Sequence, residues 1–313
     1  MTSEVLDEHA VRDIYSRISN WGRWGVEDQR GTLNTITPAH RVRAATLVRT
    51  GVSVGCASAL DTVPSPMNTL PAQHYMVTAG DHMPAHGPGV AYDFVGVFPH
   101  GQAQSHIDAL CHISHDGKLY NDRPRSEVTS RGARAHSIVA MSDGIISRGI
   151  FLDIAAARGV EFIEPNDPIQ PADFVAAERL AGVSAEPGDI VIYRTGRHER
   201  RARSGPHAER LPDGRGHLPG LDPRALCWLR EHDIAVIGSD CAHDALPSSF
   251  KNEWIPIHVG TEVYLGLPLL HNLQLERLAA ACKEHERYEF FFSIAPLNIE
   301  GGTASPINPV AIF

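Results

Sequence analysis

The segment from His100 to His112, HGQAQSHIDALCH, holds the residues whose types and spacing could carry chemistry. If it stays extended after the apolar run before it, alternate side chains share one face. The side chains on that face would be His100, Gln102, Gln104, His106 and Asp108. Such a polar row is unfavourable in a core, because buried polar groups need partners. On a pocket wall it would offer imidazole nitrogens and a carboxylate to one ion, a donor set that suits zinc or manganese better than calcium.

Other interpretations of the same segment were weighed against a metal site. His112 follows Asp108 by four residues and could bind the metal or stay free as a general base. Spacing alone leaves a solvated surface strand open. A triad of Ser105, His106 and Asp108 is excluded, because neighbouring strand residues point to opposite faces. Cys111 is better explained as a buried structural thiol than as a nucleophile, since nothing else marks it as reactive.

Composition narrows the class of protein further. The chain has 313 residues, 42% hydrophobic and 21% charged, and we expect a single domain over residues 1–313. A net charge of −9 without a basic face argues against a nucleic-acid partner. There is no signal-peptide pattern and no run of about 18 apolar residues, which argues against a membrane partner. Five cysteines without a CxxC pair indicate reduced thiols in a cytoplasmic protein.

The elements that must position these residues can be predicted from periodicity. Apolar runs predict buried strands at residues 90–98, 150–154, 189–194, 234–238 and 289–294. Helical spacing and capping residues predict helices at residues 4–17, 41–49, 171–181, 222–231 and 273–285. This alternation indicates an α/β fold. Residues 61–90, rich in Pro, Gly and His, are expected to form a long loop.

The central segment resembles the HxGTHxDxxxH motif of the putative cyclase family. That family includes bacterial kynurenine formamidase, isatin hydrolase and other metal-dependent amide and lactone hydrolases. The resemblance extends over nearly the whole chain, to WGRWGVEDQRGTLN, DALCHISHDGKLYN, EVTSRGA, SRGIFLDIA, GDIVIYRTG, HLPGLDPRAL and PLNIEGGTASPINPVAI. It implies a cyclase or kynurenine formamidase-like α/β fold, with a β-sheet core flanked by helices and an outer β-layer.

The motif carries over position by position, with departures. Its second His, its Asp and its last His fall on His106, Asp108 and His112. Its first His falls on Gln102, and His100 lies two residues earlier and could substitute for it.

The family's downstream His matches His258, and its later Glu falls near His271, an exchange that removes one negative charge. Glu262 and Glu276 are nearby carboxylates that we expect to be solvated.

The resemblance implies a hydrolase that uses a divalent metal, Zn or Mn, to cleave an amide, cyclic amide or lactone bond of a small-molecule substrate. His112 would be the catalytic acid–base. Trp21, Trp24 and His243 would line the substrate pocket. A homo-oligomer is expected from the family and from the aromatic amino-terminal loop. Two alternatives remain: a cupin-like metal dioxygenase, which would need an all-β chain, and a non-catalytic metal- or ligand-binding protein on the same fold.

Overall fold

The protein is built around a nine-stranded mixed sheet, seen in a computed structural model that describes residues 7–248, 250 and 253–313. The strand order is β1-β13-β11-β7-β8-β9-β10-β4-β12. Strands β7 to β10 run parallel, and the other neighbours are antiparallel. The bounds are β1 Ser53–Gly55, β4 His106–Asp108, β7 Ile145–Asp153, β8 Ile190–Arg194, β9 Val236–Ser239, β10 Leu269–His271, β11 Glu289–Ile294, β12 Ala304–Pro306 and β13 Val310–Ile312.

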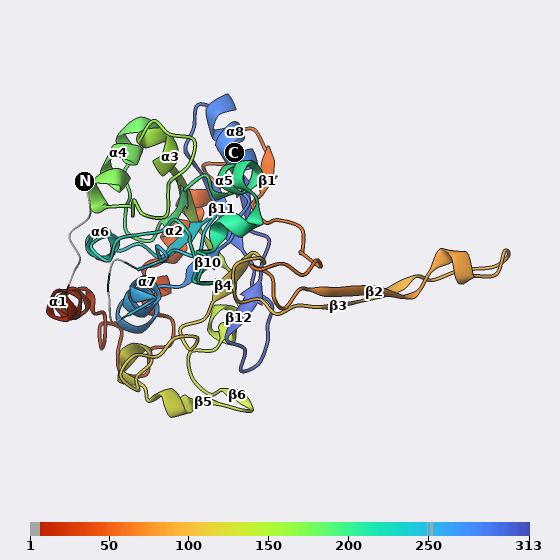
Figure 1. Ribbon diagram of the computed structural model, residues 1–313, viewed down its shortest axis with the longest axis horizontal. Coiled ribbons are helices and arrows are strands. Elements are labelled where there is room, and N and C mark those ends of the chain that lie inside the picture. The colour runs from red at the N-terminus through yellow and green to blue at the C-terminus, as the bar shows by residue number, and fades with distance from the viewer. Residues whose placement is uncertain (1–6, 249, 251–252) are drawn as a thin grey trace.

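Two small hairpins and a set of helices surround this sheet (Figure 1). The hairpins are β2 Gln73–Thr78 with β3 Tyr92–Gly96, and β5 Val128–Thr129 with β6 Gly132–Ala133. The α-helices are α1 Glu8–Ile18, α2 Pro38–Ala45, α3 Ile154–Ala157, α4 Pro171–Ala181, α5 Arg197–Ser204, α6 Ala225–Glu231, α7 Pro256–His258 and α8 Glu276–Glu284. A π-helix, Val259–Leu265, continues α7. Single 3₁₀ turns lie at Gly31–Thr35, Gly80–His82, Tyr120–Asp122, Arg125–Glu127, Ile138–Met141 and Pro206–Glu209.

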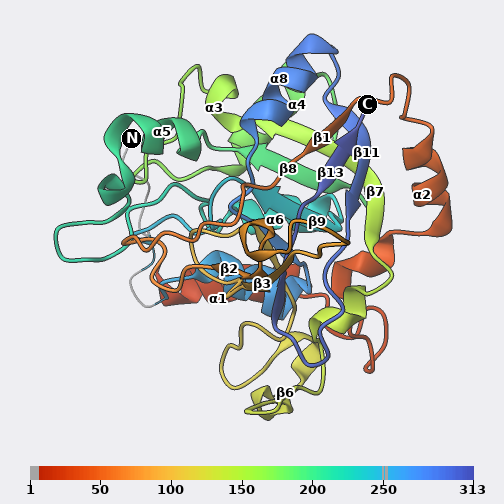
Figure 2. The same cartoon turned by 90° about the vertical axis from the view of Figure 1, so that its right-hand side faces the viewer.

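The central strands are buried on both faces, as the apolar runs predicted. In β8, Ile190 and Ile192 enter one hydrophobic layer, whereas Val191 and Tyr193 enter the other. Figure 2 shows β11, β7, β8 and β9 side by side at the centre of the molecule. Strands covered on both sides read as continuous apolar runs rather than as an alternating pattern. This arrangement confirms the α/β fold class.

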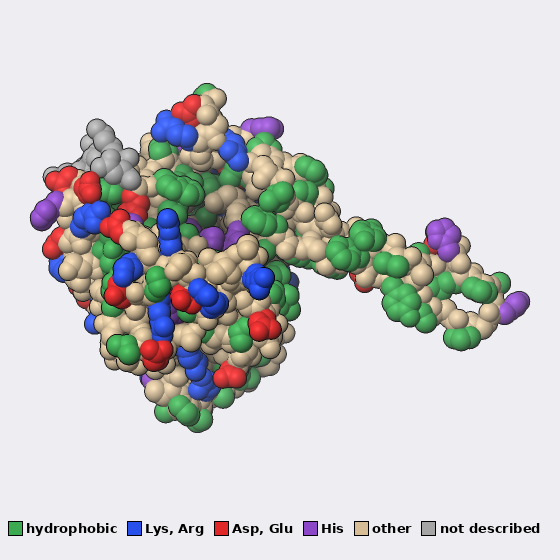
Figure 3. Space-filling model, turned by 90° about the horizontal axis from the view of Figure 1, so that it is seen from below, with side chains coloured by type: hydrophobic (Ala, Val, Ile, Leu, Met, Phe, Trp, Pro, Cys, Tyr) green, Lys and Arg blue, Asp and Glu red, His purple; other side chains and the backbone are tan. Residues whose placement is uncertain are grey.

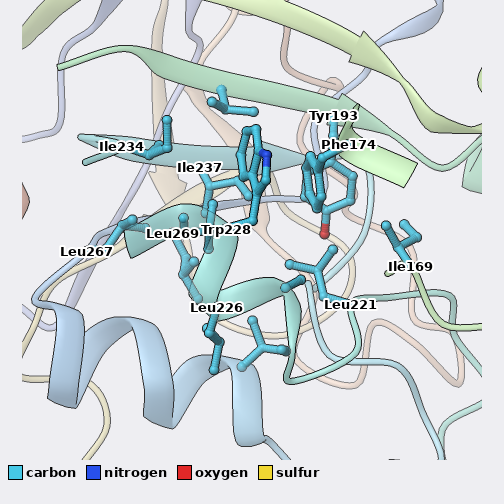
Figure 4. Packing of buried hydrophobic residues seen from close by; sticks show 14 of the residues in the cluster. Ile169, Phe174, Tyr193, Leu221, Leu226, Trp228, Ile234, Ile237, Leu267 and Leu269 are labelled. Carbon is cyan, nitrogen blue, oxygen red and sulfur yellow. The ribbon is translucent and has the colours of Figure 1, made fainter. Parts of the chain in front are cut away.

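Helices α4 and α6 cover one face of the sheet. Helix α4 spans the predicted residues 171–181; it begins at a proline after a capping glutamine and ends at Gly182, whose φ is +65°. Its Phe174 stacks on Trp228 of α6 at 4.5 Å and meets Tyr193 edge-on at 5.7 Å (Figure 4). These aromatic contacts fix both helices against the strands that lead toward the site. Of the helix predicted at residues 4–17, α1 accounts for the described part, since residues 1–6 lie outside the described residues.

One predicted strand is real but is not buried. Residues 90–98 form β3, which pairs only with β2, and this hairpin projects from the body of the protein (Figure 1). The expected long loop at residues 61–90 therefore contains β2 and half of the hairpin. An apolar run predicts a strand but does not tell which molecule covers it. Among the described residues, no helix has the length and apolar character needed to span a lipid bilayer.

Candidate metal centre

Asp108 lies at the centre of a buried group of imidazoles. Its Oδ1 is 2.9 Å from Nδ1 of His100 and 3.6 Å from Nε2 of His106, and its Oδ2 is 2.9 Å from Nε2 of His271. His258 completes the group, with its ring stacked on His271 at 5.0 Å. Burial acts to raise the pKa of Asp108, but the surrounding imidazoles hold that pKa well below its usual range.

Two short strands set this geometry. His106 and Asp108 are two residues apart on β4 and therefore share a face. Strand β10 pairs antiparallel with β4 so that His271 lies directly opposite His106, and the two rings stack at 4.6 Å. Cross-strand neighbours at this spacing place their side chains in contact. The pairing thus joins two parts of the chain that lie more than 150 residues apart.

The extended row expected from residue 100 to residue 108 is only partly correct. Strand β4 covers residues 106–108 alone, and the chain bends before it. The side-chain amide of Gln104 turns away to pair with the backbone of Asp61, at 2.8 and 3.0 Å. His100 still reaches the group, where its Nε2 hydrogen-bonds with Thr303 Oγ1 at 2.9 Å. Bends of this kind satisfy backbone groups locally and leave no trace in the alternation of residue types.

Hydrogen bonds to the outer nitrogens orient the inner ones. His106 donates its Nδ1–H to the carbonyl of Gln104 at 2.8 Å, which leaves Nε2 as the nitrogen that faces Asp108. His258 donates its Nδ1–H to Asp244 in a very short contact. Asp244 is fixed in turn, since its Oδ1 accepts the Ile257 N–H at 2.8 Å. Carboxylate or carbonyl partners of this kind set the tautomer of metal-binding histidines.

Asp244→Asn is therefore expected to weaken metal binding by about 10–100-fold, the usual cost of losing such a partner. The measurement is competition with a fluorescent zinc chelator. Asp213→Asn, at an exposed carboxylate paired with Arg215, is the matched control and should leave the affinity unchanged. Equal affinity in the Asp244 variant and the parent would show that His258 does not hold the ion.

The donors present fit a divalent transition metal. Three buried atoms, Asp108 Oδ1, His100 Nδ1 and His271 Nε2, have no hydrogen bond within the described residues. Such orphaned atoms are costly unless another group satisfies them. They belong to two sets of possible ligands whose atoms lie within 4.8 Å of one another, His100–Asp108–His112 and His106–Asp108–His271. Imidazole with a carboxylate suits zinc, manganese or iron rather than calcium.

Glu262 extends the cluster and contradicts its expected solvated state. It is fully buried on the π-helix, and it forms a third possible ligand set with Asp108 and His258. Its Oε2 accepts the Ile113 N–H at 3.2 Å, while its Oε1 has no partner among the described residues. Burial, with the nearby charge of Asp108, raises the pKa of Glu262 well above its ordinary range. The four-residue spacing from His258, one turn of helix, is the sequence signal that could have identified it.

Two cavities meet at this cluster. A small one of about 130 Å³ is lined by Gln102, His106, Asp108 and other residues of the group. A larger one of about 480 Å³ is lined by His112. Trp254, 71% exposed, lines both, and the sequence interpretation missed it. Seen from below, the body of the protein has a hollow with histidine atoms at its floor (Figure 3).

His112 sits between the metal ligand candidates and the larger cavity. Its ring stacks on His100 at 3.9 Å and lies 6.5 Å from the ring of His258. Burial lowers the pKa of His112 to about 4, so the ring is neutral at pH 7 and can accept a proton.

Comparison with known proteins identifies the family. The family described as Putative cyclase matches residues 79–243, which is more than half of the chain. The chain belongs to the cyclase family. A crystal structure of a novel cyclase, 29% identical, superposes with a TM-score of 0.82 and covers 96% of this chain and 99% of its own. No curated protein sequence matches the chain.

Isatin hydrolases share the cyclase fold at lower identity. One, bound to the product analogue thioisatinate, is 19% identical with a TM-score of 0.60, covering 89% of this chain and 99% of its own. Isatin hydrolase A from Labrenzia aggregata, bound to benzyl benzoate, is also 19% identical, with a TM-score of 0.57 and coverage of 86% and 94%. At this identity the likeness establishes the fold alone.

The cyclase-family motif is brought together in space despite its departures. Gln102, at the position of the first motif His, lies on the wall of the small cavity, and its Oε1 is buried without a hydrogen bond among the described residues. His100 supplies an imidazole to the cluster from two residues earlier. His74, His82 and His86 lie instead on the projecting hairpin, away from the cluster.

The residues predicted to bind substrate lie behind the cavities rather than on their walls. His243 is fully buried, and its two nitrogens hydrogen-bond with Tyr193 OH at 3.0 Å and with the Leu270 carbonyl at 2.8 Å. Trp21 stacks on Tyr264 at 5.5 Å, and Trp24 lies under the guanidinium of Arg23. None of the three lines either cavity described above. Their role toward substrate stays a prediction.

Arg197 ties the two halves of the centre together. It is buried at the start of α5, where Asp240 accepts the N–H groups of Thr195, Gly196 and Arg197 at 2.9–3.0 Å. Its guanidinium donates to Glu209 at 2.6 Å, to Asn272 Oδ1 at 2.7 Å and to the Gln102 carbonyl at 2.9 Å. Asn272 directly follows His271, so one side chain holds two segments of the site.

Arg197→Met is expected to lower the free energy of unfolding by about 3–5 kcal/mol, because it leaves the buried Glu209 carboxylate unpaired. Urea unfolding followed by circular dichroism measures this loss. Arg203→Met, on the exposed side of the same helix and paired with Glu161, is the control and should cost less than about 1 kcal/mol. Equal stability of the two variants would contradict the role given to Arg197.

Proposed function

We propose that the protein is a metal-dependent hydrolase that cleaves an amide, cyclic amide or lactone bond in a small substrate. The observation that carries the proposal is the buried Asp108 with four imidazoles around it, at the junction of two cavities. Membership of the cyclase family and the shared fold with isatin hydrolases support it. A cupin-like dioxygenase would be built of strands alone, so the helices of this chain argue against that alternative.

Asp108, His106, His271 and His258 would hold the ion, with His100 and Glu262 as further donors. A divalent ion in such a site acts as a Lewis acid and makes water nucleophilic at neutral pH. The carboxylate of Asp108 supplies the negative charge that balances the cation. The neutral ring of His112 accepts the proton of the attacking water at a ring nitrogen and returns it to the leaving nitrogen or oxygen.

The cavities define where a substrate would lie. A volume of about 130 Å³ beside the cluster holds a carbonyl group and little more, so the rest of the substrate must extend into the larger cavity. Trp254 stands between the two volumes and offers an aromatic face to a ring. His112 lines the larger cavity, on the side where a leaving group would depart. This geometry favours an aromatic amide or a cyclic amide over a peptide chain.

The test combines metal analysis with a substrate panel. After expression with added zinc or manganese, we expect about one ion or more per chain, because a functional site should be substantially filled. An aryl formamide, an isatin and an aromatic lactone are then followed by absorbance, before and after treatment with a chelator. Hydrolysis of one class that is lost with the metal and restored by its return would support the proposal. Less than about 0.1 ion per chain would refute the metal site, and a filled site without hydrolysis would favour a binding protein.

A further inference from the structure

The hairpin of residues 73–96, here called the β2–β3 arm, exposes apolar side chains on both of its faces. All six residues of β2 and four of the five in β3 are exposed. The arm leaves the body of the protein and is surrounded by solvent along its length (Figures 1 and 3). Seven large apolar side chains on it are 42–60% exposed, namely Tyr75, Met76, Val77, Val90, Tyr92, Phe94 and Val95.

The register gives the arm one aromatic face. Tyr75 lies opposite Phe94, and their rings stack at 5.1 Å. Tyr92 follows on the same face, since it is two residues from Phe94. The ring of Phe94 also covers Gly96, where an added Cβ would meet the ring at 3.0 Å. The opposite face carries Met76 and Val95.

An arm of this kind does not account for its own order. A single two-stranded hairpin is at best marginally stable in water, and it gains stability when a further strand or another layer packs on it. Both outer edges of the arm lack a neighbouring strand among the described residues. Apolar patches of this size on a protein surface mark contact sites rather than solvent-facing surface. Something must therefore cover the arm.

Charge limits what that partner can be. From Gly51 to Gly117 the chain contains no Lys or Arg, so the arm offers nothing to nucleic acid or to an anionic lipid surface. Between residues 73 and 96 the only acids are Asp81 and Asp93, and Asp93 is paired with His74 at 2.9 Å. A nearly uncharged surface does not repel a copy of itself, and it lacks the charge complementarity that would select a different protein.

The base of the arm provides a place for the tip of a second one. A groove of about 770 Å³ lies there, bordered by Leu70, Pro71, Tyr75 and Phe98. The tip carries Met83, Pro84 and Pro88. When two arms lie antiparallel about a two-fold axis, each tip meets the other base, so one contact satisfies both groove and tip.

The area is sufficient for such a contact. Half-exposed side chains of these sizes leave roughly 600–800 Å² in solvent when taken together. A standard stable interface buries about 800 Å² on each partner. We propose that the β2–β3 arm is a dimerisation arm that packs antiparallel on the same arm of a second copy of this chain. The inference rests on the arm alone and does not depend on the metal chemistry.

The test is the mass of the intact protein by light scattering at about 10 µM, a usual working range for specific dimers. The parent is expected at twice the chain mass of 34.1 kDa. Tyr75→Lys with Phe94→Lys places like charges in the aromatic contact and should weaken the dimer at least 100-fold, leaving a mass of one chain. The matched control, Val42→Lys with Leu180→Lys, changes two side chains that are 68% and 56% exposed on α2 and α4 and should remain dimeric.

A second measurement guards against a misfolded variant. Circular dichroism should show the same helix content in the arm variant as in the parent, because the arm lies outside both hydrophobic layers. In the parent, amide exchange in β2 and β3 should slow as protein concentration rises. A monomeric parent, a dimer that survives the Lys pair, or exchange independent of concentration would each overturn the proposal. So would a parent that stays monomeric and sediments with phosphatidylcholine vesicles, since the arm would then bind lipid.

Discussion

Asp108→Asn is expected to remove metal binding and hydrolysis together. The carboxylate faces His100, His106 and His271 within 2.9–3.6 Å and belongs to all three possible ligand sets. Partners one step removed from a metal already cost about 10–100-fold in affinity when lost, so loss of this shared ligand should exceed 100-fold. The amide is nearly isosteric but carries no negative charge, so cation and imidazoles lose their common counter-charge.

Elemental analysis and titration calorimetry with zinc measure this effect. Asp116→Asn is the control in the same stretch of chain, at an exposed carboxylate that pairs with Arg12. It should bind metal like the parent. Because the asparagine fits the same space, circular dichroism should show a folded protein. A full complement of metal in the Asp108 variant would place the ion elsewhere and remove the basis of the proposed function.

His112→Ala is expected to keep the metal and lower turnover by about 10²–10⁴-fold, the usual contribution of an acid–base group. The ring lines the larger cavity rather than the small one beside the cluster, so its removal leaves the other donors in place. The space it vacates opens to that cavity, and imidazole added to the solution should restore part of the activity. Single-turnover kinetics with the best substrate of the panel, alongside metal analysis, make the measurement.

His115→Gln is the matched control for His112. His115 lies on the same wall, but its Nδ1 is held by Tyr264 OH at 2.9 Å. Its replacement should change turnover by less than about tenfold, since no proton passes through it. If the His112 variant loses the ion as well, His112 is a ligand and the base must be sought elsewhere.

Much of the fold was predictable because it depends on local rules. The α4 helix follows from its cap, its first-turn proline and its terminal glycine, and the central strands follow from uninterrupted apolar runs. His106 and Asp108 could be chosen from alternation alone. By contrast, the contact of His106 with His271 depends on the pairing of β4 with β10, which no local pattern encodes.

The errors have physical causes of the same kind. Glu262 was expected in solvent because a lone carboxylate usually is, yet a π-helix and the backbone of Ile113 hold it inside. Residues 90–98 were expected in the core because they are apolar, but the sequence does not reveal whether a layer of the same chain covers them. Trp254 was missed because an exposed aromatic residue is identified only by the cavity that it borders.

The cluster around Asp108 also bears on how stability and activity trade against each other. Its histidines and carboxylates sit on short strands and on the α7–π-helix turn, not on the central strands β8 and β9 that carry the two hydrophobic layers. Burying so many polar groups costs folding energy that apolar residues of the same volume would not cost. The chain therefore retains a locally unfavourable arrangement for the sake of its site. A search for thermostable variants grown without metal should accumulate apolar substitutions at these positions first, and each would be selected at the expense of catalysis.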